Sequence, residues 1–361
     1  MEDIQSIKIT IFLLITAIVI SGPSFVFAYS DQTTHPALTD ETIDFFNSYL
    51  PDKAFSDSEK EIVKQGSIEE DAAPRWLRHF YDPVYERGLW GQLSSKQWAK
   101  ATFEQAGFAA VGLGSVNELF SAEDDYSWDR AIYEYTWGDR DRGLETLGHI
   151  LHLIQDASVP DHTRNDPHPP VLDLGSPYEH WTKQFDDKNL TLVEQLKGGQ
   201  PIVSSNLDDY FDNLARYSNN NFFSKDTTPD KTNDYLTPEI SKLVRDTNKN
   251  IYAYRIADSD EYKLTRLVVN PNNSNELISF FGEDERVLSD YWSRLSKQAV
   301  LHGAGVIKLF FDEVEKERKT KVLYNKNRSW AQKVFDATKN SIFNVASVFY
   351  GSSVTQADLE D

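Results

Sequence analysis

Five of the eight histidines lie within 32 residues, between His149 and His180, and this concentration constrains the chain more than any other feature. Residues 144–154 carry leucine and isoleucine at helical spacing, so the segment is expected to form a helix with a buried face. His152 and Asp156 are four residues apart and therefore project from one face of that helix. Two polar side chains buried there without partners would be costly, and a shared metal ion would remove the cost. The pattern therefore favours a metal site over an ordinary hydrogen-bonded pair.

The residues that flank this helix extend the prediction. Pro160 is expected to end the helix, and His162 follows it in a new chain direction, where it can serve a neighbouring ion. His149 lies three residues before His152. It is better explained as a core residue, or as one that orients a ligand, than as a ligand of the same ion.

The chain has no cysteine, which excludes thiolate metal sites, disulfide frameworks and cysteine nucleophiles. Any metal must be bound through nitrogen and oxygen, which suits zinc and leaves manganese and iron open. The formal net charge of −20 argues against a broad basic surface for nucleic acid or anionic membrane. It does not exclude a phosphate-bearing substrate that is attracted by local metal charge.

The N-terminus resembles an export signal. An apolar run covers residues 9–20 after Lys8, a Gly-Pro pair follows, and small residues precede a cleavage position near Ala28. We therefore predict a signal peptide over residues 1–28 and an exported protein, secreted or periplasmic. An uncleaved membrane anchor is the less favoured alternative, because the run is shorter than the about 20 residues that a helical span needs.

The rest of the chain is predicted to be mainly helical. Helices are expected over residues 36–50, 94–106, 127–135, 206–217 and 285–316, the last with a continuous apolar stripe. Residues 251–256 and 262–269 are rich in β-formers and predict a hairpin, with residues 270–275 as a loop. The predicted fold class is all-α: one multi-helix domain over residues 29–325 with a small β-hairpin insertion near 251–269. A helical tail over residues 326–361 is predicted to follow it.

Several motifs resemble a known family. The run from His152 through Asp156 and Pro160 to His162, followed by Tyr178-Glu179, is similar to the signature of the zinc-dependent phospholipase C family and its relatives, the single-strand-specific zinc nucleases. Two earlier segments agree. Residues 34–39 resemble the family's N-terminal histidine motif, and residues 70–83 resemble its middle metal motif, in a form nearer the phospholipases.

This resemblance implies an all-helical fold that holds two to three zinc ions. It also implies three ligand sets: Asp71, His79, His152 and Asp156 for one ion, His35 and the amino group of a mature Tyr29 for a second, and His162, His168 and Glu179 for the third. Asp156 would bridge the first two ions. The phospholipases carry a histidine four residues before the final glutamate, where this chain has Gly175. His168 is the preferred replacement, and His180 is the rival.

The function implied by the resemblance is phosphodiester hydrolysis, most simply cleavage of a phospholipid headgroup by a zinc-bound hydroxide. Asp71 would orient the attacking water or take its proton as well as bind metal. The expected partners are a phospholipid or other phosphodiester and, transiently, a membrane surface; no protein partner is implied. One alternative is a single-strand-specific nuclease, which would bind nucleic acid in the same cleft. The other is an exported metal-binding protein without turnover, for which Gly175 is the best argument.

Overall fold

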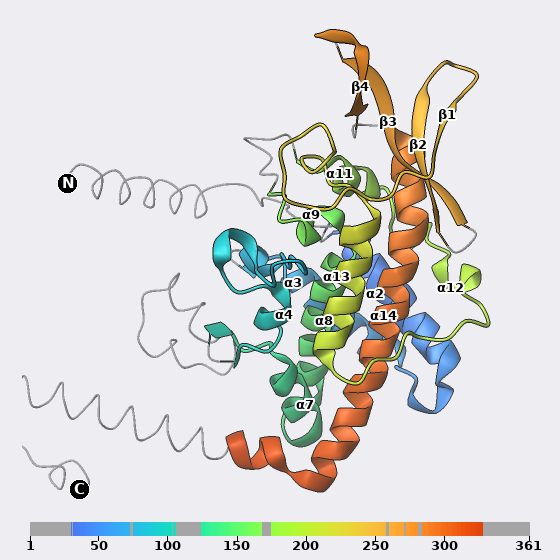
Figure 1. The fold of residues 1–361 in the computed structure, drawn as a ribbon. Coiled ribbons are helices and arrows are strands. Elements are labelled where there is room, and N and C mark those ends of the chain that lie inside the picture. Colours follow the sequence, from blue (N-terminus) through green and yellow to red (C-terminus); the bar gives the residue numbers. More distant parts are fainter. Residues whose placement is uncertain are drawn as a thin grey trace, which may run out of the picture.

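The computed structural model describes residue 30 and residues 32–72, 75–102, 104–105, 124–167, 175–257, 260–270, 272–280 and 284–327. These residues form a mainly helical structure with one four-stranded antiparallel sheet (Figure 1). No helix within these ranges is long and apolar enough to cross a membrane. The predicted signal peptide and most of the predicted tail lie outside the described residues.

The helices and strands follow one another along the chain in this order: α2 (Thr34–Tyr49), η1 (Pro51–Lys53), α3 (Asp57–Glu69), η2 (Arg75–Arg78), η3 (Leu89–Gly91), α4 (Ser95–Trp98), α7 (Trp128–Trp137), α8 (Arg140–Asp156), α9 (Pro160–Thr163), α11 (Pro177–Thr182), α12 (Leu192–Gln195), α13 (Leu207–Asn221), β1 (Lys242–Arg245), β2 (Ile251–Ala257), β3 (Asp260–Asn270), β4 (Asn273–Phe280) and α14 (Glu285–Thr320).

Helices α3 and α8 approach each other unusually closely. A Cβ atom on Gly66 of α3 would lie 1.9 Å from the backbone oxygen of Glu145, and one on Gly148 of α8 would lie 2.0 Å from the backbone oxygen of Val63. Only glycine therefore fits at these two positions. The close approach brings the C-terminal turn of α3 against the histidine-bearing face of α8.

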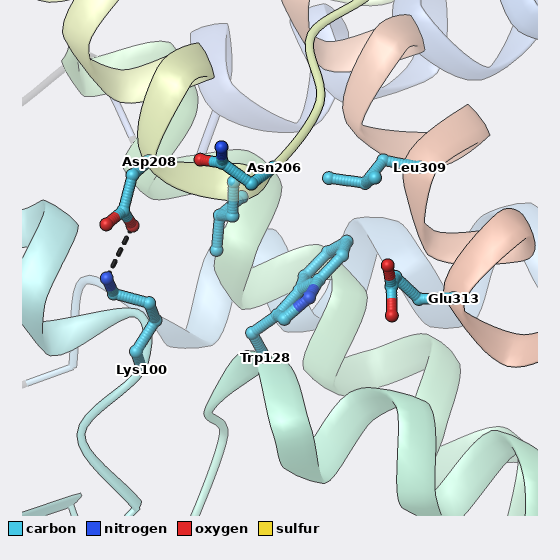
Figure 2. Close-up of a pocket in the computed structure, with 7 residues that line it drawn as sticks. Lys100, Trp128, Asn206, Asp208, Leu309 and Glu313 are labelled. Carbon is cyan, nitrogen blue, oxygen red and sulfur yellow. Dashed lines mark ion pairs between the residues drawn. The ribbon is translucent and has the colours of Figure 1, made fainter. Parts of the chain in front are cut away.

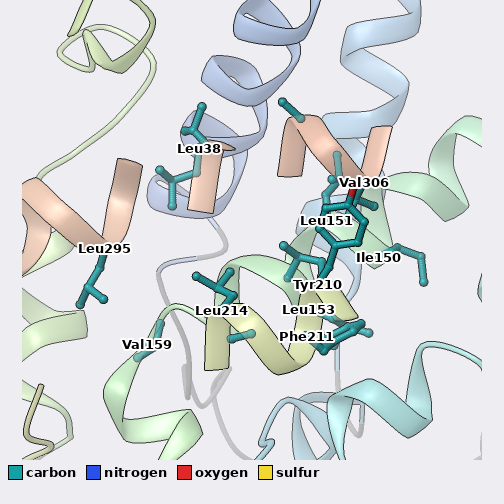
Figure 3. Close-up of a cluster of buried hydrophobic side chains, with 14 of the residues drawn as sticks. Leu38, Ile150, Leu151, Leu153, Val159, Tyr210, Phe211, Leu214, Leu295 and Val306 are labelled. Atoms are coloured by element: carbon teal, nitrogen blue, oxygen red, sulfur yellow. The ribbon is translucent and has the colours of Figure 1, made fainter. Parts of the chain in front are cut away.

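The hydrophobic core surrounds α8. Figure 3 shows Ile150, Leu151 and Leu153 of this helix among apolar side chains of α2, α13 and α14, and all three are fully buried or nearly so. Because apolar residues surround α8, its histidines and Asp156 are buried as well. The helix therefore holds polar groups at the centre of the molecule.

The β-structure is larger than predicted. The hairpin of β2 and β3 is confirmed, but β1 and β4 extend it to four strands in the order β1-β2-β3-β4. The prediction of a loop over residues 270–275 is wrong, because β4 begins at Asn273 and pairs with β3. Figure 1 shows the sheet at the end of the molecule where α14 begins, away from α7.

Helix boundaries differ from the predictions in specific places. The helix predicted over residues 94–106 is interrupted, since α4 ends at Trp98 and a turn follows. Helix α13 continues to Asn221, and α14 continues to Thr320 with Lys321 in the left-handed conformation beyond it. Pro160 does not end α8, which stops at Asp156. It instead occupies the first turn of α9, where its missing N–H costs no hydrogen bond.

Candidate metal centre

Asp156, the last residue of α8, lies at the centre of a buried group of nitrogen and oxygen ligands. We call this group, consisting of His35, Asp71, His79, His152 and Asp156, the Asp156 cluster. The side chains of the three histidines and Asp156 are fully buried. Imidazole nitrogens of His35, His79 and His152 lie 3.0 to 3.4 Å from the two carboxylate oxygens of Asp156. A carboxylate buried among them needs a compensating positive charge, which a proton on an imidazole or a metal ion would supply.

The imidazole nitrogens of His79 and His152 lie at ligand spacing from each other and from the carboxylates of Asp71 and Asp156. Nδ1 of His79 lies 3.0 Å from Oδ2 of Asp156 and 3.5 Å from Oδ1 of Asp71. Nε2 of His152 lies 3.4 Å from Asp156 Oδ2 and 3.7 Å from Asp71 Oδ1. The two imidazole nitrogens are 3.3 Å apart. Two ligands at about 2.0–2.1 Å from a tetrahedral zinc ion are about 3.3 Å apart, so these five separations fit a single ion.

The hydrogen bonds behind the imidazole rings fix which nitrogen faces the carboxylates. His35 donates from Nδ1 to the side-chain oxygen of Gln155 at 2.6 Å, and His152 donates from Nδ1 to the backbone oxygen of Ser67 at 2.6 Å. Each ring therefore carries its hydrogen on Nδ1 and presents the lone pair of Nε2 to Asp156. The two rings stack with their centroids 3.6 Å apart. This is the arrangement that orients histidine ligands in metal sites.

A second pair of ligand atoms lies on the other side of Asp156. Nε2 of His35 is 3.4 Å from Oδ1 of Asp156, while Oδ2 of the same carboxylate faces His79 and His152. The two oxygens of Asp156 therefore face different ligands. A carboxylate in this position is able to bridge two ions.

His162 and Glu179 form the third set. Nε2 of His162 lies 3.0 Å from Oε1 of Glu179, and its Nδ1 donates to the backbone oxygen of His79 at 3.2 Å. The ring of His162 stacks on Phe80, and Ser176 caps α11 so that Glu179 points inward. His162 Nδ1 is 4.0 Å from Asp156 Oδ1, so this pair adjoins the Asp156 cluster.

The charges within the cluster favour a cation. Burial alone would lower the pKa of His79, but the charge of Asp156 and hydrogen bonds to Asp156 and Glu70 raise it to about 10. Burial alone would raise the pKa of Asp156, but His162, His152 and His79 hold it well below its usual range. Asp156 thus retains its charge, and His79 carries a proton when no metal is bound. Nitrogen and carboxylate ligands of this kind fit zinc.

The structure brings together seven of the nine predicted ligand residues; the other two, Tyr29 and His168, lie outside the described residues. Gly175 has a φ of +79°, and an added Cβ would meet nothing within 4 Å. His180 is exposed although its neighbour Glu179 is buried. His180 therefore does not share the buried environment of the third set.

Two residues that contact the cluster were not predicted as part of the site. Glu70 is fully buried, with Oε1 3.7 Å from Nε2 of His79 and Oε2 2.6 Å from Nδ1 of His149. His149 is thus one contact removed from the cluster. Gln155 orients His35 and donates to Thr39 at 2.9 Å. In the sequence the only signal was adjacency, since Glu70 precedes Asp71 and Gln155 precedes Asp156.

A surface pocket elsewhere on the molecule shares no residue with the cluster. Figure 2 shows it between α7, α13 and α14, with Trp128, Asn206 and Leu309 in its wall. Lys100 and Asp208 form an ion pair of 2.5 Å at its edge. No buried titratable group of the Asp156 cluster faces this pocket, so it offers no chemistry comparable to that of the cluster.

Comparison of the sequence with protein-family models and with curated proteins gives no match. Among solved structures, the alpha toxin from Clostridium absonum is similar at 12% identity and a TM-score of 0.42. The likeness covers 80% of this chain and 66% of the toxin, so the chain spans just under two thirds of that protein. These values are too low to carry an argument about function. The functional evidence is the geometry of the Asp156 cluster.

Proposed function

We propose that this protein is an exported zinc-dependent phosphodiester hydrolase of the phospholipase C type. The observation that carries the proposal is the pair of imidazole nitrogens of His79 and His152, which lie 3.3 Å apart and 3.0 to 3.7 Å from carboxylate oxygens of both Asp71 and Asp156. These separations suit a shared zinc ion. His35 and the other oxygen of Asp156 would hold a second ion. His162, His168 and Glu179 would hold a third.

Zinc bound at these ligands would supply a water of lowered pKa and positive charge opposite the phosphoryl oxygens. The side chains of the protein would orient the substrate and the attacking water and would exchange protons with them. Asp71 and Glu179 are 8% and 5% exposed, whereas the other described ligand side chains are fully buried. Substrate would therefore approach beside these two carboxylates. Asp71 is the group in position to hold the attacking water or accept its proton.

A surface loop next to the cluster supports a lipid substrate. Residues 80–91 follow His79 directly, and within them Val84 and Tyr85 are 47% and 48% exposed and Trp90 is 71% exposed. Three exposed apolar side chains in this one segment, which ends in η3, suit contact with a lipid surface, where tryptophan and tyrosine are favoured. A net charge of −20 also disfavours nucleic acid as the substrate.

A substrate panel tests the proposal. Protein reconstituted with zinc would be assayed on phosphatidylcholine vesicles, on a chromogenic phosphodiester and on single-stranded DNA, and again after chelation. We expect zinc-dependent release of phosphocholine that Asp156→Asn abolishes and Asp208→Asn, a carboxylate change at the pocket in Figure 2, leaves intact. Preferential cleavage of DNA would favour the nuclease alternative. Zinc binding without hydrolysis of any substrate would contradict enzymatic function.

We further propose that export removes residues 1–28 and leaves Tyr29 as the mature N-terminus. The carbonyl of Ser30 accepts a hydrogen bond from the backbone N–H of His35 at 3.0 Å, which holds the start of the described chain beside a cluster histidine. The amino group exposed by this cleavage is the proposed remaining ligand of the second ion. N-terminal sequencing of protein recovered outside the cytoplasm should begin at Tyr29; a blocked or intact Met1 would contradict this.

The domain division is proposed as predicted, with a catalytic domain over residues 29–325 and a separate tail over residues 326–361. Truncation after residue 325 should leave zinc-dependent hydrolysis unchanged. Loss of soluble, active protein on that truncation would show instead that the tail belongs to the catalytic domain.

A further inference from the structure

A second group of metal-binding side chains lies outside the Asp156 cluster. It consists of Glu69, Glu145 and His149, each of which offers one ligand atom within 4.8 Å of the other two. Glu69 is the last residue of α3, and Glu145 and His149 are four residues apart on α8. The close approach of these two helices brings the three side chains together.

His149 has the hydrogen bonding expected of a metal ligand. Its Nδ1 atom lies 2.6 Å from Oε2 of Glu70, and the same oxygen accepts hydrogen bonds from Nε and Nη2 of Arg75 at 2.8 and 2.6 Å. A carboxylate oxygen paired with an arginine accepts the imidazole hydrogen, so Nδ1 of His149 is the donor and the lone pair remains on Nε2. His149 is 1% exposed, and this Nε2 atom has no hydrogen-bond partner. A buried acceptor without a donor is costly, and a cation would remove the cost.

The two carboxylates come from different helices that pack closely, Glu69 from α3 and Glu145 from α8, and both offer an oxygen within 4.8 Å of a nitrogen of His149. The side chain of Gln65 donates to Oε1 of Glu69 at 2.6 Å, which holds one carboxylate in place. Two adjacent partly buried carboxylates beside a lone imidazole nitrogen form a suitable cation site.

We propose that Glu69, Glu145 and His149 bind a divalent cation such as zinc at a site distinct from the Asp156 cluster. Three protein ligands leave at least one position for water, and the two carboxylates are partly exposed, so this ion would exchange more readily than those of the cluster. Glu70 links the sites, because its other oxygen lies 3.7 Å from Nε2 of His79. The site does not depend on the proposed hydrolase activity.

Zinc binding to the metal-free full chain tests the site. Bound zinc would be counted by elemental analysis at saturation and by titration against a competing chelator. We expect Glu145→Gln and Glu69→Gln each to bind about one equivalent less than the wild type, or to bind that equivalent at least tenfold more weakly. Glu61→Gln, an exposed carboxylate change on α3, should match the wild type. Asp156→Asn should lose metal from the Asp156 cluster but still bind zinc at Glu69, Glu145 and His149.

Equal zinc stoichiometry and affinity in the wild type and in folded Glu145→Gln would overturn the proposal. If these variants do not fold, zinc-edge anomalous scattering from wild-type crystals decides the matter: a peak between the three side chains supports the site, and its absence at saturating zinc contradicts it. These experiments measure zinc binding and not hydrolysis. Their outcome is therefore independent of whether the proposed function is correct.

Discussion

The Asp156 cluster and His302 of α14 show two different outcomes for a buried histidine. His302 is 3% exposed, and its Nδ1 lies 2.8 Å from the backbone oxygen of Gln298, one turn earlier in the same helix. Its only ring neighbour among the described residues is Tyr210, edge-on at 6.5 Å. Within the described part of the chain no carboxylate forms an ion pair with it, and burial lowers its pKa to about 4.

The histidines of the cluster are buried to the same degree but differ in their neighbours. His35 and His152 also donate from Nδ1 to a carbonyl, yet their Nε2 atoms face Asp156. The carbonyl bond alone is thus a core feature that His302 shares. Convergence of the second nitrogen on a buried carboxylate shared with other imidazoles distinguishes a metal site from a core histidine.

The largest effect is expected from Asp156→Asn, which removes the shared charge while keeping the shape. Phosphodiester hydrolysis should fall at least about 100-fold, and at least one equivalent of zinc should be lost. His149→Ala, one contact removed, should reduce activity by only about 10–100-fold. Steady-state kinetics and elemental analysis would check both. Equal damage from the two substitutions would contradict the assignment of Asp156 as a ligand and His149 as one contact removed.

Two glycine-to-alanine substitutions compare how tightly α8, which carries the cluster, and α14, which carries His302, are packed. Gly148→Ala would set a Cβ 2.0 Å from a backbone oxygen of α3, whereas Gly303→Ala on α14 meets a Thr42 methyl group at 2.8 Å. We expect the first to lower the free energy of unfolding by about 3 kcal/mol and to reduce bound zinc, and the second to cost about 1 kcal/mol with zinc unchanged. Urea denaturation of both variants measures this. A larger loss in Gly303→Ala would show that α14, not the α3–α8 contact, limits stability.

The acid response of His302 follows from its lowered pKa. The unfolded chain takes up a proton near pH 6.5 and the folded chain only near pH 4. Stability from this residue is therefore complete above pH 6.5 and is lost as the pH falls toward 4. Between pH 7 and 5 the wild type should lose about 2 kcal/mol more than His302→Gln, which does not titrate. Parallel pH dependences of unfolding in the two proteins would rule out a buried neutral His302.

The smallest effect is expected at His180, which is exposed and adjoins Glu179. His180→Ala should leave bound zinc unchanged, whereas His168→Ala should lower it by about one equivalent. Metal analysis of the two purified variants gives the comparison. Loss of zinc from His180→Ala alone would reverse the assignment of the third ligand set.

Local pattern was sufficient for much of the architecture. Helical periodicity predicted α2, α7, α13 and α14 to within a few residues, and β-rich runs predicted β2 and β3. It did not predict α3, nor β1 and β4. Strands β1 and β4 gain their stability from pairing with β2 and β3, which no short window of sequence contains.

The sequence by itself determined the ligand types: histidine and carboxylate without cysteine, with His152 and Asp156 on one helical face because they are four residues apart. The tertiary structure decided which atoms meet. Glu70 and Asp71 are neighbours in the chain, yet Glu70 contacts His149 and Asp71 faces His152. That division depends on how closely α3 packs on α8, a contact between residues some 80 positions apart that the glycines permit but do not by themselves reveal.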